Sequence, residues 1–322
     1  LVGIRVNEPV VIISKSGDGK YYLHTSAAGD QVNLTKDATG AWLNVYKYKQ
    51  VNLTASEDWQ ELSVTYDLKS YSEITAIGAT LDDFLYEGLF PAICAKKNIA
   101  KLFYPSYVKT YLEKDVRDLL KIKDIMLFLK FMKLCATRVG SVFNASELAN
   151  EVGVDSKTIT SWLSVLTASY VVYLLPPYYE NISKRLVKSP KLYFCDPGLA
   201  CYLLDIESPR QLARDKMRGN IFENFVVMEA VKHRMNDGKE GGVFFYRDSN
   251  GNEVDILIKE EGEITAFEVK SSMTYNKEFE AVLKKLPGWI KTPVRRKAVV
   301  YSGDFENNAG DIEIINYKNL RF

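Results

Sequence analysis

Two short acidic segments on either side of a tight turn constrain this chain more than any other feature. Glu-Val-Asp at residues 253–255 and Glu-Val-Lys at residues 268–270 each alternate polar and apolar side chains, as strands do, and Glu261-Gly262 lies midway between them. A two-residue turn at Glu261-Gly262 predicts a β-hairpin in which Asp255 lies opposite Glu268. Because side chains alternate along a strand, Asp255, Glu268 and the lysine that ends the second segment share one face.

Two carboxylates at opposed strand positions repel each other unless a cation compensates them. Mg²⁺ suits two carboxylates together with a backbone carbonyl and waters, so Asp255 and Glu268 are candidate metal ligands. Lys270 is a candidate to orient or help deprotonate a metal-bound water, and Glu223, on a predicted helix, is a candidate further carboxylate. The alternative is a surface hairpin whose charges pair for solubility, with Glu253 facing Lys270.

The region around the hairpin, residues 201–322, alternates helix and strand, which predicts an α/β sandwich around a mixed sheet. The periodicity predicts helices over residues 218–231 and 277–286, and strands over residues 243–246, 254–258, 264–269 and 297–301. A basic cluster in this region is either a phosphate track or a solvated helix edge. It comprises Lys284, Lys285, Lys291, Arg295, Arg296 and Lys297.

Residues 71–200 predict a helical region that ends in a winged helix-turn-helix. Apolar stripes predict helices over residues 107–120 and 124–138, and a short helix capped by Ser146 is followed by a glycine turn and a helix over residues 156–168. The outer face of that last helix and a basic wing would contact DNA phosphates and base edges. These residues are Lys157, Thr158, Thr160, Ser161, Lys184, Arg185, Lys188 and Lys191. The alternative is a module that serves only packing or protein docking.

Residues 1–70 predict a β-rich N-terminal segment of unknown role. Strands are expected over residues 10–13 and 21–25, with a turn at residues 16–20 between them, and a further strand follows a turn at residues 38–40. A last alternating stretch is centred on Val64. The whole chain is thus expected to be a multidomain α+β or α/β protein, divided into residues 1–70, 71–200 and 201–322.

Composition excludes several classes of protein. A formal net charge of +1 argues against a protein that coats nucleic acid through overall basicity. No apolar stretch approaches the roughly 20 residues of a membrane span, and no signal peptide is evident. The four cysteines form no C-x-x-C pair, and with only two histidines a zinc site is not expected. Free thiols are typical of a cytoplasmic protein, which is the expected location.

The hairpin resembles the PD-(D/E)XK nuclease superfamily, which includes restriction endonucleases and Holliday-junction resolvases. Asp255 and Glu268-Val-Lys270 match the motif, with Glu223 as the helix acid. The resemblance implies a restriction-endonuclease-like fold, metal binding by Asp255 and Glu268, a catalytic Lys270 and Mg²⁺-dependent phosphodiester hydrolysis. Many members of this fold have lost catalysis, so a catalytically silent interaction or regulatory module is the alternative.

A wider resemblance covers about residues 70–305. It rests on residues 107–117, 161–170, 174–179, 184–193, 196–200 and 218–224, which are similar to prokaryotic AAA-type ATPases with a C-terminal domain of unknown function, DUF4143. The family implies ATP, but the nearest stretch to a P-loop, Ser14 to Tyr21, lacks its first glycine and its final Ser or Thr. The resemblance therefore leaves open a third hypothesis, the C-terminal part of an ATPase whose motor domain is missing. Possible partners are DNA, a second copy of the chain, or an ATPase subunit.

Overall fold

The computed structural model describes residues 80–95, 99–111, 125–181 and 188–322, together with the backbone of seven strands near the N-terminus. Those strands form two antiparallel sheets, of order β1-β2-β3-β4 and β5-β6-β7. Strands β2 and β3 cover the two segments predicted to be strands and pair with Lys15 opposite Tyr21. The predicted turn between them and the stretch around Val64 lie outside the described residues. The bounds are β1 Val2–Ile4, β2 Val11–Lys15, β3 Tyr21–Thr25, β4 Val32–Leu34, β5 Lys36–Asp37, β6 Gly40–Val45 and β7 Lys49–Leu53.

The middle of the chain is helical, as its apolar periodicity predicts. Phe128, Met132 and Cys135 are fully buried along one face of α6, which confirms the predicted inner stripe. The helix expected over residues 107–120 differs from the structure, because α4 begins earlier and its last described residue is Tyr111. The bounds are α2 Leu81–Glu87, α3 Pro91–Ala95, α4 Ala100–Tyr111, α6 Ile125–Ala136, α7 Ala145–Val152 and α8 Ser156–Ala168.

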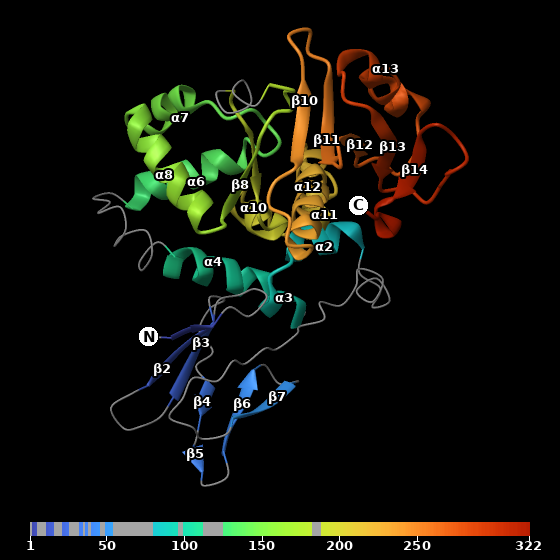
Figure 1. The fold of residues 1–322 in the computed structure, drawn as a ribbon. Coiled ribbons are helices and arrows are strands. Elements are labelled where there is room, and N and C mark those ends of the chain that lie inside the picture. Colours follow the sequence, from blue (N-terminus) through green and yellow to red (C-terminus); the bar gives the residue numbers. More distant parts are fainter. Residues whose placement is uncertain are drawn as a thin grey trace.

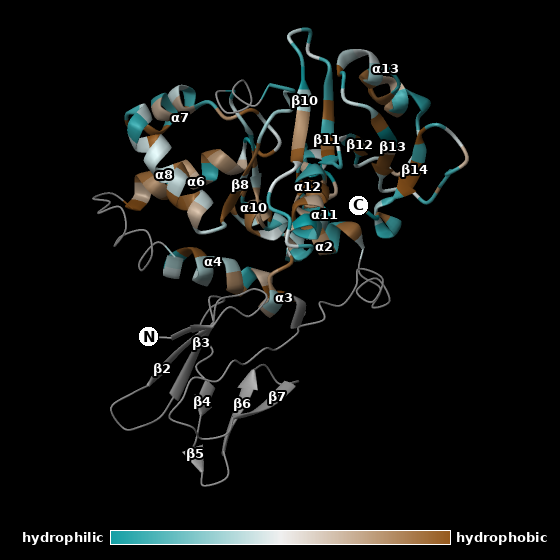
Figure 2. Ribbon diagram, in the orientation of Figure 1, coloured by the Kyte–Doolittle hydropathy of each residue, from teal (hydrophilic) through white to brown (hydrophobic). Residues whose placement is uncertain are grey.

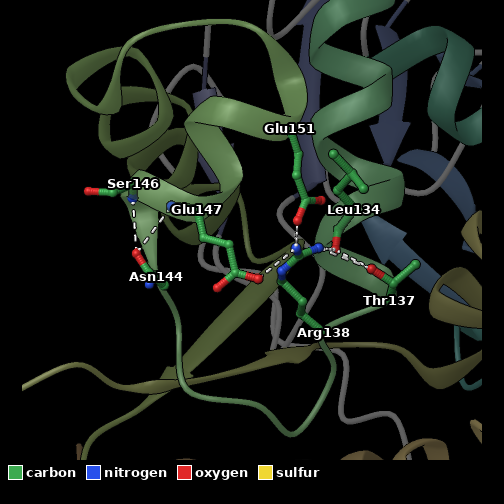
Figure 3. Close-up of polar contacts among 7 residues, drawn as sticks. All are labelled: Leu134, Thr137, Arg138, Asn144, Ser146, Glu147 and Glu151. Atoms are coloured by element: carbon green, nitrogen blue, oxygen red, sulfur yellow. Dashed lines mark hydrogen bonds and ion pairs between the residues drawn. The ribbon is translucent and has the colours of Figure 1, made fainter.

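Helices α7 and α8 form the predicted helix-turn-helix pair. Gly153 ends α7 with a φ of 92°, a left-handed conformation that glycine adopts at little cost. The N-cap of α7 is Asn144, whose Oδ1 accepts hydrogen bonds from the backbone of residues 146 and 147, so the prediction that Ser146 caps this helix was wrong. In Figure 3, Arg138 links α6 to α7: it donates to the Leu134 carbonyl of α6 at 3.1 Å, bonds Glu147 of α7 at 3.2 Å and also pairs with Glu151.

A two-stranded sheet connects the helices to the rest of the molecule. Strands β8 (Val172–Leu175) and β9 (Lys191–Phe194) are antiparallel, and the chain after β8 bonds onto β10 through Tyr178 N–H and the carbonyl of Phe245. Two short helices follow β9, namely α10 (Pro197–Leu203) and α11 (Pro209–Leu212). The predicted basic wing is wrong at Lys191, which is only 2% exposed. Lys184 and Arg185 lie outside the described residues.

The C-terminal region is a five-stranded mixed sheet of order β10-β11-β12-β13-β14 with helices on both faces (Figure 1). Strands β10, β11 and β12 are antiparallel, and β12, β13 and β14 are parallel. The predicted helices and strands are all present with shifted ends, and β14 was not predicted from the sequence. The bounds are α12 Arg218–Asn236, β10 Val243–Arg247, β11 Glu253–Glu260, β12 Glu263–Lys270, η2 Lys277–Glu280, α13 Ala281–Trp289, β13 Val294–Tyr301, β14 Glu313–Asn316 and η3 Tyr317–Asn319.

Each face of this sheet buries its own apolar core. Ile256, Phe267 and Val300 pack in one cluster with α12 and the helices of the middle region. Leu257 and Ala266 pack in a second cluster with α13. Figure 2 shows hydrophobic residues concentrated in the sheet near β13 and β14. Among the described helices, none is both long and apolar enough to span a bilayer.

The basic cluster after the hairpin is largely neutralised by acidic neighbours. Arg296 forms a two-bond contact with Glu313, with N–O distances of 3.0 and 2.8 Å, and Lys297 lies 2.5 Å from Asp311. Lys284 bonds Glu280 at 2.5 Å. These pairs favour the solvated-edge interpretation of the cluster over a phosphate track.

Candidate active site

The predicted hairpin register is confirmed over most of its length. Strands β11 and β12 pair from Glu260–Glu263 to Ile256–Phe267, around a turn whose residues Glu261 and Gly262 have φ angles of 50° and 86°. These positive angles are those of the two-residue turn that the Glu-Gly sequence predicts. The ladder ends at Ile256, one pair before the expected contact between the strands at Asp255. The backbone ladder therefore stops short of the end where the acidic residues lie.

A bulge in β11 lies at this end of the ladder. On the β10 side, Phe244 pairs with Leu257 but Tyr246 pairs with Val254, so β11 carries one extra residue in this interval. A bulge bends a strand and re-aims the side chains next to it. Asp255 lies within the bulged interval, and its Oδ2 accepts a hydrogen bond of 2.8 Å from the N–H of Val269. An aspartate side chain thus binds β12 where the backbone ladder stops.

Glu268 and Lys270 lie side by side at the end of β12. Lys270 Nζ donates to Glu268 Oε1 at 2.5 Å, whereas Glu268 Oε2 is buried and accepts no hydrogen bond. Glu268 is 6% exposed. Burial, together with the negative charge of Asp255, raises the pKa of Glu268 to about 8. Burial opposes ionisation of Lys270, but Asp255 and Glu268 hold its pKa above the ordinary value. Lys270 pairs with Glu268, whereas Glu253 pairs with Lys191 and Arg247, so the alternative pairing of Lys270 with Glu253 is wrong.

Glu223 contacts a lysine and a tyrosine that the sequence analysis did not place in the site. Its Oε1 accepts from Lys191 Nζ at 3.1 Å and from Tyr193 Oη at 2.6 Å, and Lys191 also pairs with Glu253. Burial and the charge of Asp255 raise the pKa of Glu223 to about 7, against the opposing effects of these two donors. Burial lowers the pKa of Lys191, but the surrounding carboxylates outweigh it and keep the ammonium charged.

An asparagine next to Glu223 fixes this arrangement. Asn224 is fully buried, and its side-chain amide accepts from the N–H of Phe194 at 2.7 Å and donates to the carbonyl of the same residue at 2.9 Å. The amide thereby pairs with both backbone groups of Phe194, the last residue of β9, and fixes the position of α12 against that strand. Because Lys191 and Tyr193 are two residues apart on a strand, their side chains lie on the same face of β9, and both contact Glu223 from that face.

A signal for these contacts was present in the sequence. Asn220, Glu223 and Asn224 have the i, i+3, i+4 spacing of one helix face, and all three are polar in a helix whose neighbouring residues are buried and apolar. Asn220 donates to the carbonyl of Val139 at 2.9 Å. This polar stripe on a buried helix predicts buried polar partners, because an unpaired polar group in a core is costly.

The structure brings Asp255, Glu268, Lys270 and Glu223 into one electrostatically linked cluster, but it leaves the candidate DNA-binding residues elsewhere. Thr158, Thr160 and Ser161 lie on α8, well to one side of the hairpin in Figure 1. Lys157, Thr160 and Ser161 are exposed there, and the Thr160 hydroxyl donates to the Ser156 carbonyl at 2.9 Å. Lys188 is exposed just before β9.

The acidic cluster offers two carboxylates to a cation rather than a larger cage. Over the described residues, no group of three or more histidine, cysteine, aspartate or glutamate side chains is arranged to hold a metal ion. Oδ2 of Asp255 accepts the bond from Val269, so Oδ1 is the Asp255 oxygen offered to a cation, and Glu268 offers its buried Oε2, which accepts no hydrogen bond. Two carboxylate oxygens completed by waters fit the oxygen preference of Mg²⁺, which retains several waters in most protein sites.

Comparisons with known proteins relate both regions of the chain that form the site to families of unknown function. Residues 78–210 match the family described as a domain of unknown function, DUF8612, and residues 218–320 match the domain of unknown function DUF4143. Lys191 and Tyr193 therefore come from the first matched region, and Glu223, Asp255, Glu268 and Lys270 come from the second.

Two uncharacterized proteins, from Mycobacterium bovis and Mycobacterium tuberculosis, are each 27% identical to the chain over 252 residues. The alignment covers 76% of this chain and 55% of each relative, so the chain spans about half the length of these curated relatives. No solved structure matches the chain significantly. The comparisons thus show similarity to DUF8612 over residues 78–210, followed by similarity to DUF4143 over residues 218–320.

Proposed function

We propose that the C-terminal sheet and α12 form a nuclease-like domain of PD-(D/E)XK type that hydrolyses phosphodiester bonds in DNA with a divalent cation. The observation that carries this proposal is the buried Glu268 Oε2, which has no hydrogen-bond donor and lies beside the charge of Asp255. A buried carboxylate oxygen without a partner is costly, so it marks a position where a cation would stabilise the folded chain. The link to AAA-type ATPases is a separate proposal that rests on the resemblance alone.

Asp255 and Glu268 would hold the cation through Oδ1 and Oε2. A bound Mg²⁺ would supply Lewis acidity and a water of lowered pKa. Since the pKa of Glu268 is about 8 without a cation, Glu268 carries its proton at neutral pH and must release it to bind. Metal uptake is therefore expected to release protons and to strengthen as the pH rises.

Lys270 would position the attacking water or stabilise the charge that develops on the phosphate. Its side chain is 35% exposed, against 8% for that of Glu268, so its ammonium reaches the solvent boundary where a phosphate would approach. Glu223 would assist by keeping the cluster negative around Asp255. The exposed residues of α8 and Lys188 would bind phosphates of the DNA backbone at positions away from the acidic cluster.

Cation binding and cleavage should be measured on the same set of variants. Mn²⁺ and Mg²⁺ titrations by calorimetry, followed by cleavage of single-stranded, duplex and branched DNA, would use the wild type, Asp255→Asn, Glu268→Gln and Lys270→Met. Asp255→Asn and Glu268→Gln should lose binding and cleavage, whereas Lys270→Met should bind the cation but lose cleavage at least about 100-fold.

Matched controls lie on the same sheet and its neighbouring helix. Glu261→Gln changes an exposed acid at the tip of the same hairpin, and Lys285→Met changes an exposed lysine of α13. Both should behave as wild type. Absence of cation uptake by the wild type at millimolar concentration would contradict the proposal.

A second candidate is an interaction module without catalysis, and one observation favours it. Lys191 joins Glu223 and Glu253 in a buried ion network between the two matched regions, as a purely structural joint would. Wild-type levels of folding and of partner binding in Asp255→Asn, combined with no cleavage by either protein, would favour this candidate.

A further inference from the structure

The acidic cluster divides into two halves, each with two carboxylates and one lysine, and Glu253 of the inner half also lies 3.5 Å from Nη1 of Arg247. The inner half consists of Glu223, Glu253 and Lys191, and the outer half consists of Asp255, Glu268 and Lys270. In the inner half, the side chain of Lys191 is 2% exposed and bridges both carboxylates, with its Nζ 5.4 Å from the centre of the Phe245 ring. In the outer half, Lys270 bonds one oxygen of Glu268 and leaves the other bare.

We propose that Lys191 is the resident cation of the inner half, so that the cluster takes one divalent cation, at Asp255 and Glu268, and that removal of the Lys191 ammonium opens a second cation position at Glu223 and Glu253. The assignment of the outer position rests on the proposed function, but that of the inner position does not. Glu223 is accordingly a partner of Lys191 and not a ligand of the divalent cation.

Position and charge both support this assignment. An ammonium that bridges two carboxylates occupies the space in which a divalent cation would be bound by the same oxygens, and the two cannot be present together. Tyr193 donates to Glu223 Oε1 at 2.6 Å, so the oxygen that faces Lys191 already accepts two bonds. Every charged contact that Lys191 makes in the described residues is with an acid of this cluster.

The lysine is also held rigidly in this position. It begins β9, its backbone bridges to Val142, and Asn224 locks the far end of the same strand onto α12. A cation delivered by a strand of the first matched region therefore completes a cluster in the second. If β9 moved away from α12, Lys191 would leave Glu223 and Glu253, and these two carboxylates would then bind a metal ion in its place.

Mn²⁺ stoichiometry, measured on the full chain by equilibrium dialysis and by electron paramagnetic resonance of the bound ion, tests the proposal. The wild type should bind one Mn²⁺, Lys191→Met should bind two, and Lys191→Arg should bind one. Lys285→Met, which changes an exposed lysine of α13, is the matched control and should bind one.

Carboxamide variants test the proposal without removing the lysine, should Lys191→Met fail to fold. Glu223→Gln and Glu253→Gln should still bind one Mn²⁺, whereas Asp255→Asn and Glu268→Gln should bind none. Two ions in the wild type, or loss of the ion in Glu223→Gln, would overturn the proposal. One ion in Lys191→Met and none in the wild type would retain Lys191 as the resident cation but contradict the proposed nuclease site.

Discussion

The inner and outer halves of the acidic cluster hold two carboxylates and one lysine each, yet among these described residues only the outer half has a buried carboxylate oxygen without a hydrogen bond, Oε2 of Glu268. The lysine of the inner half is delivered by β9 and is 2% exposed, whereas the side chain of Lys270, at the end of β12, is 35% exposed. An acidic motif therefore does not by itself specify a metal site. The origin and burial of the neighbouring lysine decide which carboxylates remain available to a cation.

The largest expected effect comes from removing the inner lysine. In metal-free buffer, Lys191→Met should lower the free energy of unfolding by about 3–5 kcal/mol, because it leaves buried carboxylates without their partner. Denaturant unfolding measures this loss, and Lys285→Met should stay within about 0.5 kcal/mol of the wild type. A loss below about 1 kcal/mol would show that Lys191 does not stabilise the carboxylates of the inner half and would contradict the comparison.

Next in size is the asparagine that aligns the inner half. Asn224→Leu should cost about 2–4 kcal/mol of stability, because the N–H and the carbonyl of Phe194 both lose their buried partner. The same unfolding measurement applies, and Asn250→Leu, at an exposed loop position, serves as its comparison. Equal losses in the two variants would mean that α12 is not registered against β9 by this amide.

The outer half should affect the pH dependence of the free energy of unfolding. The pKa of Glu268 is about 8 in the folded chain and near its ordinary value when unfolded, so the folded chain binds the proton more tightly between about pH 4.5 and 8. The stability due to this proton is fully present below about pH 4.5 and is lost as the pH rises through 8. Glu223, with a pKa of about 7, acts in the same direction.

Glu268→Gln should therefore unfold with a weaker pH dependence than the wild type and exceed its stability at pH 8 by about 1–3 kcal/mol in metal-free buffer. Adding Mg²⁺ at pH 8 should stabilise the wild type and leave Glu268→Gln unchanged. Thermal melts across pH 5–8, with Glu261→Gln as control, measure both effects. Parallel pH profiles for wild type and Glu268→Gln would contradict the assignment of the high pKa.

The smallest effect is expected far from the cluster, on α8. Lys157→Ala should leave stability within about 0.5 kcal/mol, since the side chain is exposed, and should reduce the slope of log affinity for DNA against log salt by about one. Binding isotherms at several salt concentrations measure the slope. An unchanged slope would remove Lys157 from the proposed DNA-binding face.

Local patterns predicted those parts of the site that depend on neighbouring residues in the sequence. The turn Glu261-Gly262 and the alternation on either side specify the hairpin register, which the structure confirms as far as Ile256 and Phe267. The apolar stripe of α6 and the turn at Gly153 were predicted for the same reason.

Long-range features could not be predicted in this way. Nothing in the local sequence marks the extra residue of β11, because a bulge is defined by the strand opposite it. Burial of Lys191 was missed because a lysine is seldom buried unless paired, and its partners lie more than 30 residues away in the sequence, on α12 and β11. The candidate metal ligands were thus identified, but the group that separates them from Glu223 was not.

The most direct test of the account is a crystal structure of the full chain grown with Mn²⁺, read through the anomalous signal of the ion. We predict one ion about 2–2.5 Å from Glu268 Oε2 and from an oxygen of Asp255, with Lys191 still bonded to Glu223 and Glu253. A crystal soaked in Mn²⁺ that shows no ion beside Glu268, or an ion between Glu223 and Glu253 with Lys191 displaced, would contradict it.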